Sequence, residues 1–478
     1  AGSDPNMSGL GKQSVLEFSL SDFRYHERGI DKYVSERLTG AAQFSGIGYD
    51  PEQYLFLSKL KARWPNYPDA AVRHCIGYIR DGVLVDQQTR HFFLKEWAGP
   101  NEEMHKIKCR GVTNFADKST ALAPKPSPGQ LAADIVSGSA SLTLTPLGVG
   151  NANYPASGEV CLGNEVMGFT RSGDVLTLTR GIANTQARNH SAGTTVQLVL
   201  KYVNARADTV VNDLVLNYTQ TPATYLRTEI SDANAAEVTR WASAVLLNTR
   251  IVTPTPVATL LGELSDLGFI IWEDDRNQSL NLRANRPFDG GPRVISDRTM
   301  KEIKTIENED RRLTQVRFLS KRFDPTKALN DDNNYELKVL RVDAPALTLF
   351  GAVRTKNVYT RWLDQGDLNT VGIITLRYLN RFNRAPKTWE ITIDATEKDV
   401  SLAEVVQIET DQSPDSNGVT EVFLAQVFQR EEPDPYHTVK INCQSYQFSG
   451  RYAVIAPNTA PQYPDATTSE RATMGFIA

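Results

Sequence analysis

Residues 158–200, GEVCLGNEVMGFTRSGDVLTLTRGIANTQARNHSAGTTVQLVL, decide the fold class of this chain. Val160 and Leu162 alternate with polar neighbours, and a Ser172-Gly173-Asp174 turn precedes the apolar run from Val175 to Leu178. Glycine and aspartate supply turn geometry, whereas β-branched residues favour strands. The stretch therefore predicts three or four short strands joined by tight turns. No nucleophile, base and orienting residue stand together in it.

The composition is that of an ordinary globular protein. The chain has 478 residues, of which 40% are hydrophobic and 23% charged. A prior of about 150 residues per domain suggests roughly three domains. The net charge of −4 excludes a global basic field that would hold nucleic acid. No uninterrupted apolar run reaches the length of about 18 residues that a membrane span requires.

Two local runs of basic residues are interpreted as solvated faces rather than as nucleic-acid sites: Arg311, Arg312, Arg317, Lys321 and Arg322, and Arg377, Arg381 and Arg384. The four cysteines, Cys75, Cys109, Cys161 and Cys443, are far apart and form no CxxC pair. The chain shows no secretory signal, so we expect reduced and mostly buried thiols.

The first half of the chain is predicted to be β. Residues 1–13 are expected to be a cloning remnant and a flexible N-terminus. Residues 14–118 are expected to form a small antiparallel barrel or sandwich, with an Asp81-Gly82 hairpin and separate strands at 83–85 and 91–97. Residues 119–130 are rich in proline and predict an extended linker. Residues 131–201 then form an inserted all-β module.

Residues 202–299 predict an α+β domain because the apolar period changes from two to about three and a half. Helices are expected at 209–217 and at 232–241, the latter with Ser231 as N-cap. A third helix follows Pro256 and is ended by Gly268; its apolar face consists of Val257, Leu260, Leu261, Leu264 and Leu267. A hairpin from Phe269 to Arg283 completes the domain, with helices on one face of a small sheet.

The last third of the chain returns to strands. Residues 300–455 are expected to form a second β-barrel region with one helix at 366–382. Residues 456–478 are rich in proline, threonine and alanine and predict an extended tail. The predicted fold class is thus α+β but mainly β, with several small antiparallel barrels or sandwiches and one helix-on-sheet domain.

No metal or phosphate site is predicted. The histidines, at positions 26, 74, 91, 105, 190 and 437, show no HxH or HExxH spacing. The loop at Asp411, Ser413, Asp415 and Asn417 differs from a calcium loop because glycine falls at the eighth position and no glutamate closes it. Gly290-Gly291-Pro292 lacks the Lys-Ser or Lys-Thr of a phosphate loop.

No catalytic residue is predicted either. The acidic groups Glu273, Asp274 and Asp275, and Asp331 and Asp332, have the carboxylates of a glycosidase, but adjacent acids on a turn are usually solvated. Cys109 and Cys161 lie within strand patterns, where a hydrolase nucleophile would need a base or a helix N-terminus beside it. The sequence therefore assigns no catalytic, cofactor-binding or metal-binding residue.

A longer pattern resembles tail-tip and baseplate proteins of tailed bacteriophages and prophages. It consists of a Gly-Glu-hydrophobic start at Gly158, Gly163-x-Glu165, a leucine-rich strand, Thr179-Arg180-Gly181, Ala187-Arg188-x-His190 and a Gly-Thr-x-Val close. APKPSPGQLAADI upstream and PTPVATLLGELSDLGFIIWEDDRNQSLNLRANRP downstream also resemble tail hub sequences. The resemblance covers about half of the chain.

The resemblance implies a structural role as a hub at the tip of a long, non-contractile tail. It implies a homotrimeric ring around the tail channel that contacts the distal tail protein ring, the tape-measure protein, and a central fibre or receptor-binding protein. Genomic DNA would pass the channel only transiently. The protein would be assembled in the host bacterial cytoplasm and reside in the virion tail tip.

Two other functions stay open at this point. The first is a host-surface binding protein whose 131–201 module contacts glycan or protein on the bacterium, which would need an exposed aromatic patch. The second is a cell-wall or polysaccharide hydrolase, which would need a cleft with shifted carboxylates. Some relatives of the hub family carry an iron-sulfur cluster. No such cluster is expected in this chain because its four cysteines lack clustered spacing, although folding can gather distant cysteines. No cofactor is expected.

Overall fold

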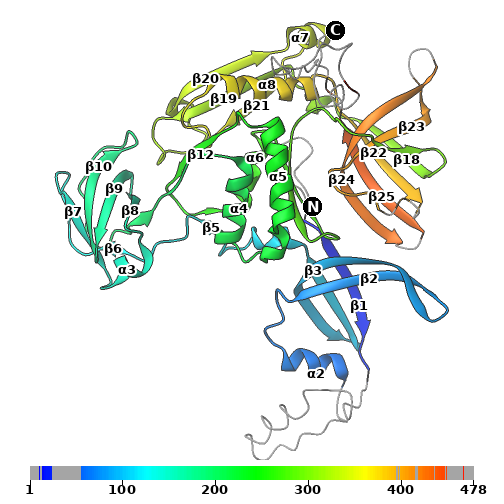
Figure 1. The fold of residues 1–478 in the computed structure, drawn as a ribbon, viewed down its shortest axis with the longest axis horizontal. Helices are drawn as coiled ribbons and strands as arrows, with labels where there is room; N and C mark the ends of the chain where they lie inside the picture. The colour runs from blue at the N-terminus through cyan, green and yellow to red at the C-terminus, as the bar shows by residue number, and fades with distance from the viewer. Residues whose placement is uncertain are drawn as a thin grey trace, which may run out of the picture. The chain divides into compact units, whose positions relative to one another are not determined.

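The structure is a computed structural model that describes residues 10, 13–23, 55–394, 397, 399–414, 418–434, 437–446, 448 and 467. The chain divides into two compact units. The smaller unit is Gln13–Asn114 with Asp275–Gln278, and the larger holds the described residues of Ala1–Lys12, Phe115–Asp274 and Ser279–Ala478. The chain is mainly β, with several separate sheets and half-barrels and one helix-on-sheet region (Figure 1). The expected tail, 456–478, lies outside the described residues except for Thr467, as does most of 1–13.

The smaller unit is a four-stranded antiparallel sheet with one short helix, α2 (Phe56–Arg63). The strand order is β1 (Val15–Ser21), β4 (Met104–Arg110), β3 (Val83–Asn101) and β2 (Ala71–Arg80). Its core consists of Leu57, Phe92, Leu94, Trp97, Ile107 and Cys109. The helix contributes Leu57, so burial of apolar surface holds α2 to the sheet.

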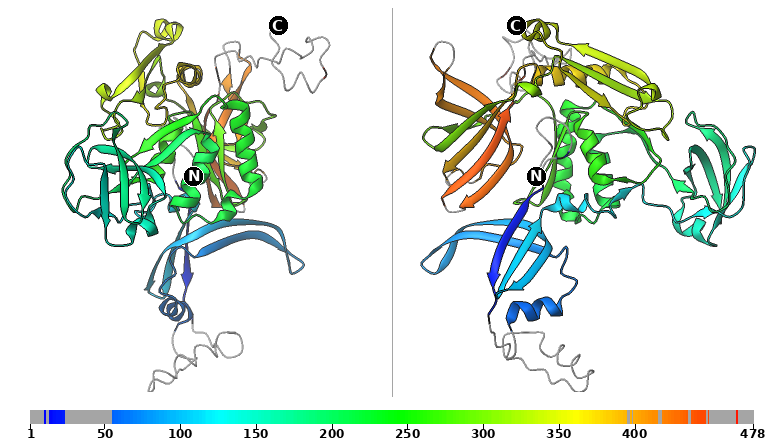
Figure 2. Two further views of the ribbon diagram at one scale, coloured as in Figure 1. Left: turned by 60° about the vertical axis from the view of Figure 1, so that its left-hand side comes forward. Right: turned by 180° about the vertical axis from the view of Figure 1, so that it is seen from behind.

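Strands β2 and β3 extend beyond the other two strands as an arm of residues 72–92 (Figures 1 and 2). The β4 ladder on β3 begins at Phe93, so the arm strands pair only with each other in the sheet. Asp81 and Gly82, with φ of 53° and 77°, close the arm, as a two-residue hairpin turn requires. The predicted strands at 83–85 and 91–97 are one strand, because the polar residues between them pair across the arm.

The stretch quoted first contributes four strands to a six-stranded sheet. Its order is β11 (Gln197–Leu198), β8 (Ser157–Leu162), β9 (Glu165–Ser172), β10 (Val175–Ile182), β7 (Ser141–Thr145) and β6 (Gln130–Leu131). One short helix, α3 (Val149–Asn153), follows β7. Val160, Leu162 and Leu176 are fully buried in its core. The alternation of the sequence thus predicted the inward face of β8.

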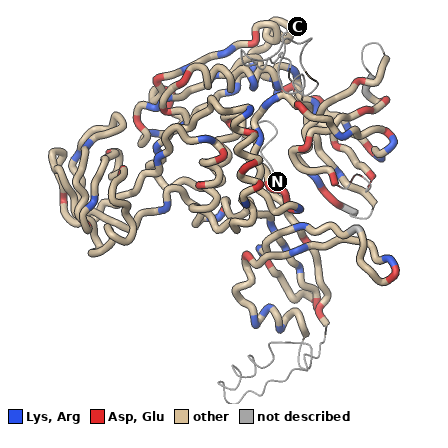
Figure 3. The backbone as a smooth tube through the Cα atoms, viewed as in Figure 1, with Lys and Arg blue, Asp and Glu red and all other residues tan. Residues whose placement is uncertain are grey.

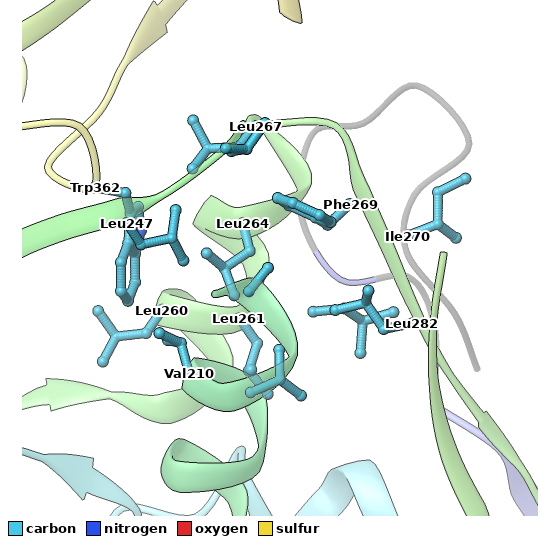
Figure 4. Close-up of a cluster of buried hydrophobic side chains, with 14 of the residues drawn as sticks. Val210, Leu247, Leu260, Leu261, Leu264, Leu267, Phe269, Ile270, Leu282 and Trp362 are labelled. Carbon is cyan, nitrogen blue, oxygen red and sulfur yellow. The ribbon is translucent and has the colours of Figure 1, made fainter. Parts of the chain in front are cut away.

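Two distant stretches of chain build the α+β core. The first stretch supplies β12 (Leu200–Ala205), α4 (Ala207–Tyr218), α5 (Thr228–Trp241), β13 (Leu247–Ile251), α6 (Val257–Ser265), β15 (Phe269–Asp274) and β16 (Ser279–Ala284). The second supplies β19 (Gln315–Arg322), β20 (Tyr335–Val342), α7 (Ala344–Phe350), β21 (Thr355–Tyr359) and α8 (Leu368–Phe382). Leu264 and Phe269 share one buried cluster with Trp362 (Figure 4).

The predicted helix after Pro256 is confirmed. Leu260 and Leu264 are fully buried on its apolar face, and Gly268 has the positive φ of 89° expected near a helix end. The helix predicted at 232–241 begins earlier, at Thr228, and Ser231 lies inside it instead of capping it. The Ser231 hydroxyl bonds back to the carbonyl of Leu226, an alternative that serine offers within a helix.

Strands β5 (Leu122–Ala123) and β14 (Thr255–Pro256) pair with each other, and six further strands form a second six-stranded sheet. Its order is β17 (Arg293–Ser296), β23 (Val405–Pro414), β24 (Thr420–Asp434), β25 (Thr438–Ser445), β22 (Lys387–Asp394) and β18 (Met300–Glu307). The boundary expected between 299 and 300 falls between β17 and β18, which belong to this one sheet. The stretch 313–382 leaves the sheet for the α+β core and returns, a path that strand patterns along the sequence do not reveal.

Candidate functional site

The motif that carries the tail-protein resemblance converges on the carboxylate of Glu165. Arg180 makes a bidentate pair with it, Nε to Oε1 at 2.7 Å and Nη2 to Oε2 at 2.8 Å. His190 Nε2 lies 2.9 Å from Oε2, and the backbone N–H of Arg188 donates to the same oxygen at 2.9 Å. The N–H of Gly181 donates to Oε1 at 3.1 Å. Three separate motif segments therefore meet at one acid.

The network is buried. Glu165 is fully buried, and the side chains of Arg180 and His190 are 11% and 8% exposed. Burial alone would raise the pKa of Glu165, but hydrogen bonds from Arg180, His190 and the Arg188 N–H outweigh it and lower that pKa to about 2. Glu165 is thus an anion at neutral pH that serves as a structural acceptor.

Position 181 requires glycine so that its N–H can reach the carboxylate of Glu165. Gly181 has φ of 60°, and a Cβ there would lie 3.1 Å from the carbonyl oxygen of Thr185 and 3.2 Å from the nitrogen of Ala187. The sequence pattern contains Arg180, Gly181 and His190, but it did not identify Glu165 as their common partner. The available signal was an acid at a strand start followed by an arginine and a histidine in one module.

A second buried network joins Ser58, His105 and Asp22 in the smaller unit. His105 Nε2 lies 2.9 Å from Asp22 Oδ2, and the Ser58 hydroxyl donates to the same oxygen at 2.7 Å. Trp97 Nε1 donates to His105 Nδ1 at 3.0 Å. The side chains of His105 and Asp22 are fully buried. The three residue types are those of a serine hydrolase, so their protonation decides what they can do.

The hydrogen bonds fix the histidine tautomer. An indole N–H can only donate, so His105 Nδ1 must be the unprotonated acceptor. The ring proton then lies on Nε2 and points at Asp22. Nε2, the nitrogen 3.4 Å from the Ser58 hydroxyl, therefore has no lone pair to take the serine proton. This arrangement holds structure and does not activate a nucleophile.

We expect no covalent labelling of Ser58 by a fluorophosphonate probe, because its hydroxyl donates to Asp22 and has no general base. Labelling is measured by intact mass and peptide mapping of the native chain, with Ser58→Ala as the control. A Ser58 adduct that disappears in the alanine variant would contradict the tautomer assignment.

A third group of acids, with side chains about 15% exposed, lies in the α+β core. Glu263 accepts hydrogen bonds from Arg361 Nη2 and Trp362 Nε1, both at 3.0 Å. Asp364 pairs with Arg322 Nη2 at 3.0 Å. Desolvation by burial raises the pKa of both acids, although the arginines oppose it. Both carboxylates are held by guanidinium groups, so their contacts are those of internal ion pairs.

The acids singled out from the sequence occupy different environments. Glu273 is buried, with 2% exposure, and is not a solvated hairpin residue. Asp275 pairs with Arg90 at 2.8 Å. Asp331 caps a short 3₁₀ turn by accepting from the N–H of Asn333, and Asp332 binds Arg317 and the Tyr359 hydroxyl. These contacts do not assemble a pair of acids facing a common space.

Several side chains of the two basic runs form ion pairs or are buried, unlike the side chains of a solvated face. Arg317 pairs with Asp332, Lys321 with Glu336, and Arg322 is buried against Asp364. Arg381 is only 4% exposed and donates to the side-chain oxygens of Asn285 and Gln426. The prediction of solvated faces is therefore wrong for Arg322 and Arg381. Basic and acidic residues are interspersed along the described chain (Figure 3).

The described residues contain no group of three His, Cys, Asp or Glu side chains placed to hold a metal ion. Within the same residues, no helix is long and apolar enough to cross a membrane. Asp411 lies in strand β23, and positions 415–417 of the loop compared with a calcium site lie outside the described residues.

The cysteines differ in exposure. Cys75 is exposed on the arm, whereas Cys109, Cys161 and Cys443 are buried, and all four are free thiols. Burial raises the pKa of Cys109 and of Cys161 to about 11, while hydrogen bonds from Thr89 and Gln87 lower the pKa of Cys75. The thiolate is the reactive form, so reactivity should concentrate at Cys75.

We expect a maleimide to modify one thiol rapidly in the native chain and four after denaturation. The buried thiols are both inaccessible and protonated at neutral pH. Counting adducts by intact mass during the reaction measures the stoichiometry, and Cys75→Ser should abolish the fast phase. Rapid native modification of two or more thiols would contradict the burial of the other three.

No protein-family model matches the sequence, and no curated protein does. Among the solved structures that are similar to the chain, three are tail proteins of phage or bacterial origin. Prophage tail protein gp18 from Listeria monocytogenes EGD-e is 9% identical, with TM-score 0.35, covering 79% of this chain and 84% of that chain. A tail protein from Neisseria meningitidis MC58 is 11% identical, with TM-score 0.32, over 79% of this chain and 88% of that chain.

The third structure is the 43 kDa tail protein of prophage MuSo2 from Shewanella oneidensis. It is 11% identical, with TM-score 0.33, covering 78% of this chain and 88% of that chain. At these TM-scores and identities, the likeness to the three structures assigns neither a family nor a function to this chain.

Proposed function

We propose that this chain is a structural protein of a bacteriophage or prophage tail, forming a hub ring at the tail tip. One observation carries the proposal: the sequence pattern that resembles tail-tip proteins is a set of residues meeting at Glu165. Residues that meet in one buried network specify the structure of a module, which supports the interpretation that the resemblance to tail proteins is one of structure.

In this proposal the chain works by binding and needs neither catalysis nor a cofactor. Three copies close a ring around the tail channel, because a heterologous interface that closes produces a ring with an axial passage. The ring contacts the distal tail protein above, the tape-measure protein in the lumen and a fibre or receptor-binding protein below. The protein is assembled in the host cytoplasm, and DNA crosses its channel only transiently.

The test is the location and stoichiometry of the chain in assembled particles. An antibody raised against the purified chain should detect it in purified tailed particles. Electron cryomicroscopy of those particles should place it at the tail tip, with three copies per particle. Absence of the chain from purified particles, or density for it only in fibres, would overturn the hub function. Turnover of purified cell wall or surface polysaccharide would favour a hydrolase instead.

A further inference from the structure

Three buried side-chain amides lie around the guanidinium group of Arg381 in the larger unit. Arg381, on α8, donates from Nη1 to Asn285 Oδ1 at 2.8 Å and from Nη2 to Gln426 Oε1 at 3.0 Å. Gln444 lies directly opposite Gln426 in the ladder of β24 and β25, so the two side chains leave the same face of the sheet, with Cβ atoms about 5 Å apart. All three amide residues are buried, so the cluster belongs to the interior.

The hydrogen bonds to Arg381 fix the orientation of two of these amides. A guanidinium group can only donate, so Asn285 and Gln426 must face it with their oxygens. Their NH₂ groups are thereby left as donors, and both are buried without a hydrogen-bond partner in the described part of the chain. The same holds for both amide atoms of Gln444. Since a buried donor without an acceptor costs about 1–3 kcal/mol, the cluster needs an acceptor from outside these residues.

A second guanidinium group adds positive charge to the cluster. Tyr446 follows Gln444 by two residues, and its ring centre lies 4.6 Å from the guanidinium carbon of Arg381 and 5.7 Å from that of Arg283. The hydrogen bond of Arg283 goes to the neutral carbonyl of Ala403. Burial lowers the pKa of Arg381, and the charge of Arg283 lowers it further. A negative charge at the cluster would therefore stabilise the charged form of Arg381.

The burial of the cluster limits the size of its ligand. Gln444 is fully buried and Arg381 is only 4% exposed, which leaves no surface opening of the size that a nucleotide or a sugar requires. A monatomic anion such as chloride needs little more room than the single water molecules that commonly occupy protein interiors. Water donates as well as accepts, whereas the amide NH₂ groups and the nearby positive charges favour a ligand that only accepts.

We propose that the cluster of Asn285, Arg381, Gln426 and Gln444 binds a small inorganic anion, with chloride as the ion of matching size. This inference goes beyond the hub function and does not depend on it. The amide NH₂ groups donate to the ion in charge-assisted hydrogen bonds, and the guanidinium groups offset its charge. Because Arg381 belongs to α8 and the two glutamines to β24 and β25, the ion joins the α+β core to the second six-stranded sheet.

A chloride titration of the full chain tests the proposal. The chain is dialysed into sodium gluconate, whose anion is too large for the cluster, and sodium chloride is added at constant ionic strength. Hydrogen exchange of peptides from α8 and β25 should slow about tenfold for each tenfold rise in chloride above the dissociation constant. Peptides from β9 and β10 should not respond. Equal exchange of α8 and β25 in the two salts would overturn the proposal and would mean that the amides hold only water.

Gln444→Glu tests the position of the ion. The new carboxylate takes the place of the anion, so α8 and β25 should be protected without chloride and should lose their response to it. Gln197→Glu is the matched control, because Gln197 is another buried glutamine, whose amide bonds the Ser127 N–H and the Lys125 carbonyl. This variant should keep the full chloride response of α8. A response that persists unchanged in Gln444→Glu would overturn the assignment of the site.

Bromide provides a readout that needs no variant. In crystals of the unaltered chain grown with sodium bromide, an anomalous difference peak should lie within hydrogen-bond distance of the side chains of Gln426 and Gln444. Peaks confined to surface arginines would mean an adventitious ion only and would overturn the proposal. The hub function is unaffected by either result, because its test is the location of the chain in assembled particles.

Discussion

Replacing Glu165 by alanine is expected to destabilise the module of residues 130–198 by about 3–5 kcal/mol. The substitution leaves the guanidinium of Arg180 buried without its carboxylate, and the N–H groups of Gly181 and Arg188 lose their acceptor. The loss is a large part of the 5–15 kcal/mol that stabilises a typical domain. Hydrogen exchange of peptides from β9 and β10 should accelerate by at least a hundredfold.

Two variants control this experiment. Glu165→Gln keeps an acceptor of the same shape but loses the charge, so its effect should be intermediate. Arg171→Ala removes an arginine of the same module whose hydrogen bonds lie at the exposed surface, and it should have a smaller effect. Unchanged exchange in Glu165→Ala would show that the network does not hold the module together.

The same network predicts a dependence on pH. The pKa of Glu165 is about 2 in the folded chain against an ordinary 4.5. A carboxyl with a lowered folded pKa contributes stability that is fully present above about pH 4.5 and is lost as pH falls towards 2. The Glu165→Gln variant should lose this part of the acid dependence, as measured by exchange of the same peptides.

The sequence predicted local elements better than long-range partners. The helix from Val257 and the strands from Ser157 to Ile182 follow from the spacing of apolar residues, which burial enforces along each element. Glu165 was missed because its partners lie in a neighbouring strand and a loop, and spacing along the chain does not encode distance across a sheet. Asp22 and His105 were missed for the same reason.

The pairing of strands in the second six-stranded sheet was likewise not predictable from spacing along the sequence. β17 lies beside β23 in the sheet although more than 100 residues separate them, and the intervening 313–382 stretch packs elsewhere. Residues 297–299 connect β17 and β18, which are the two outermost strands of this sheet, and the sequence does not distinguish a turn within a domain from a boundary between domains. Ser58 was likewise unremarkable in sequence, since its significance depends on the histidine tautomer.

Replacing Asp22 by alanine is expected to have the largest effect in the smaller unit, about 3–5 kcal/mol. Its carboxylate accepts from the N–H groups of Leu57 and Ser58 at 2.7 and 2.9 Å, so it caps α2 from a distant part of the chain. The residue at the helix's own N-cap position, Leu55, makes no side-chain cap bond. Loss of Asp22 also leaves the buried His105 N–H without its acceptor.

The measurement is hydrogen exchange of peptides from α2 and β4, which should lose protection together because one carboxylate joins them. Asp22→Asn keeps an acceptor for the helix and should cost less, and Glu17→Gln on the exposed face of β1 is the control. Hydrogen bonds from Ser58, His105 and the helix N–H groups lower the pKa of Asp22 against the effect of burial. Stability of the unit should therefore fall as pH drops below the ordinary value of 3.8. Loss of protection in α2 alone, with β4 unchanged, would show that Asp22 caps the helix without joining it to the sheet.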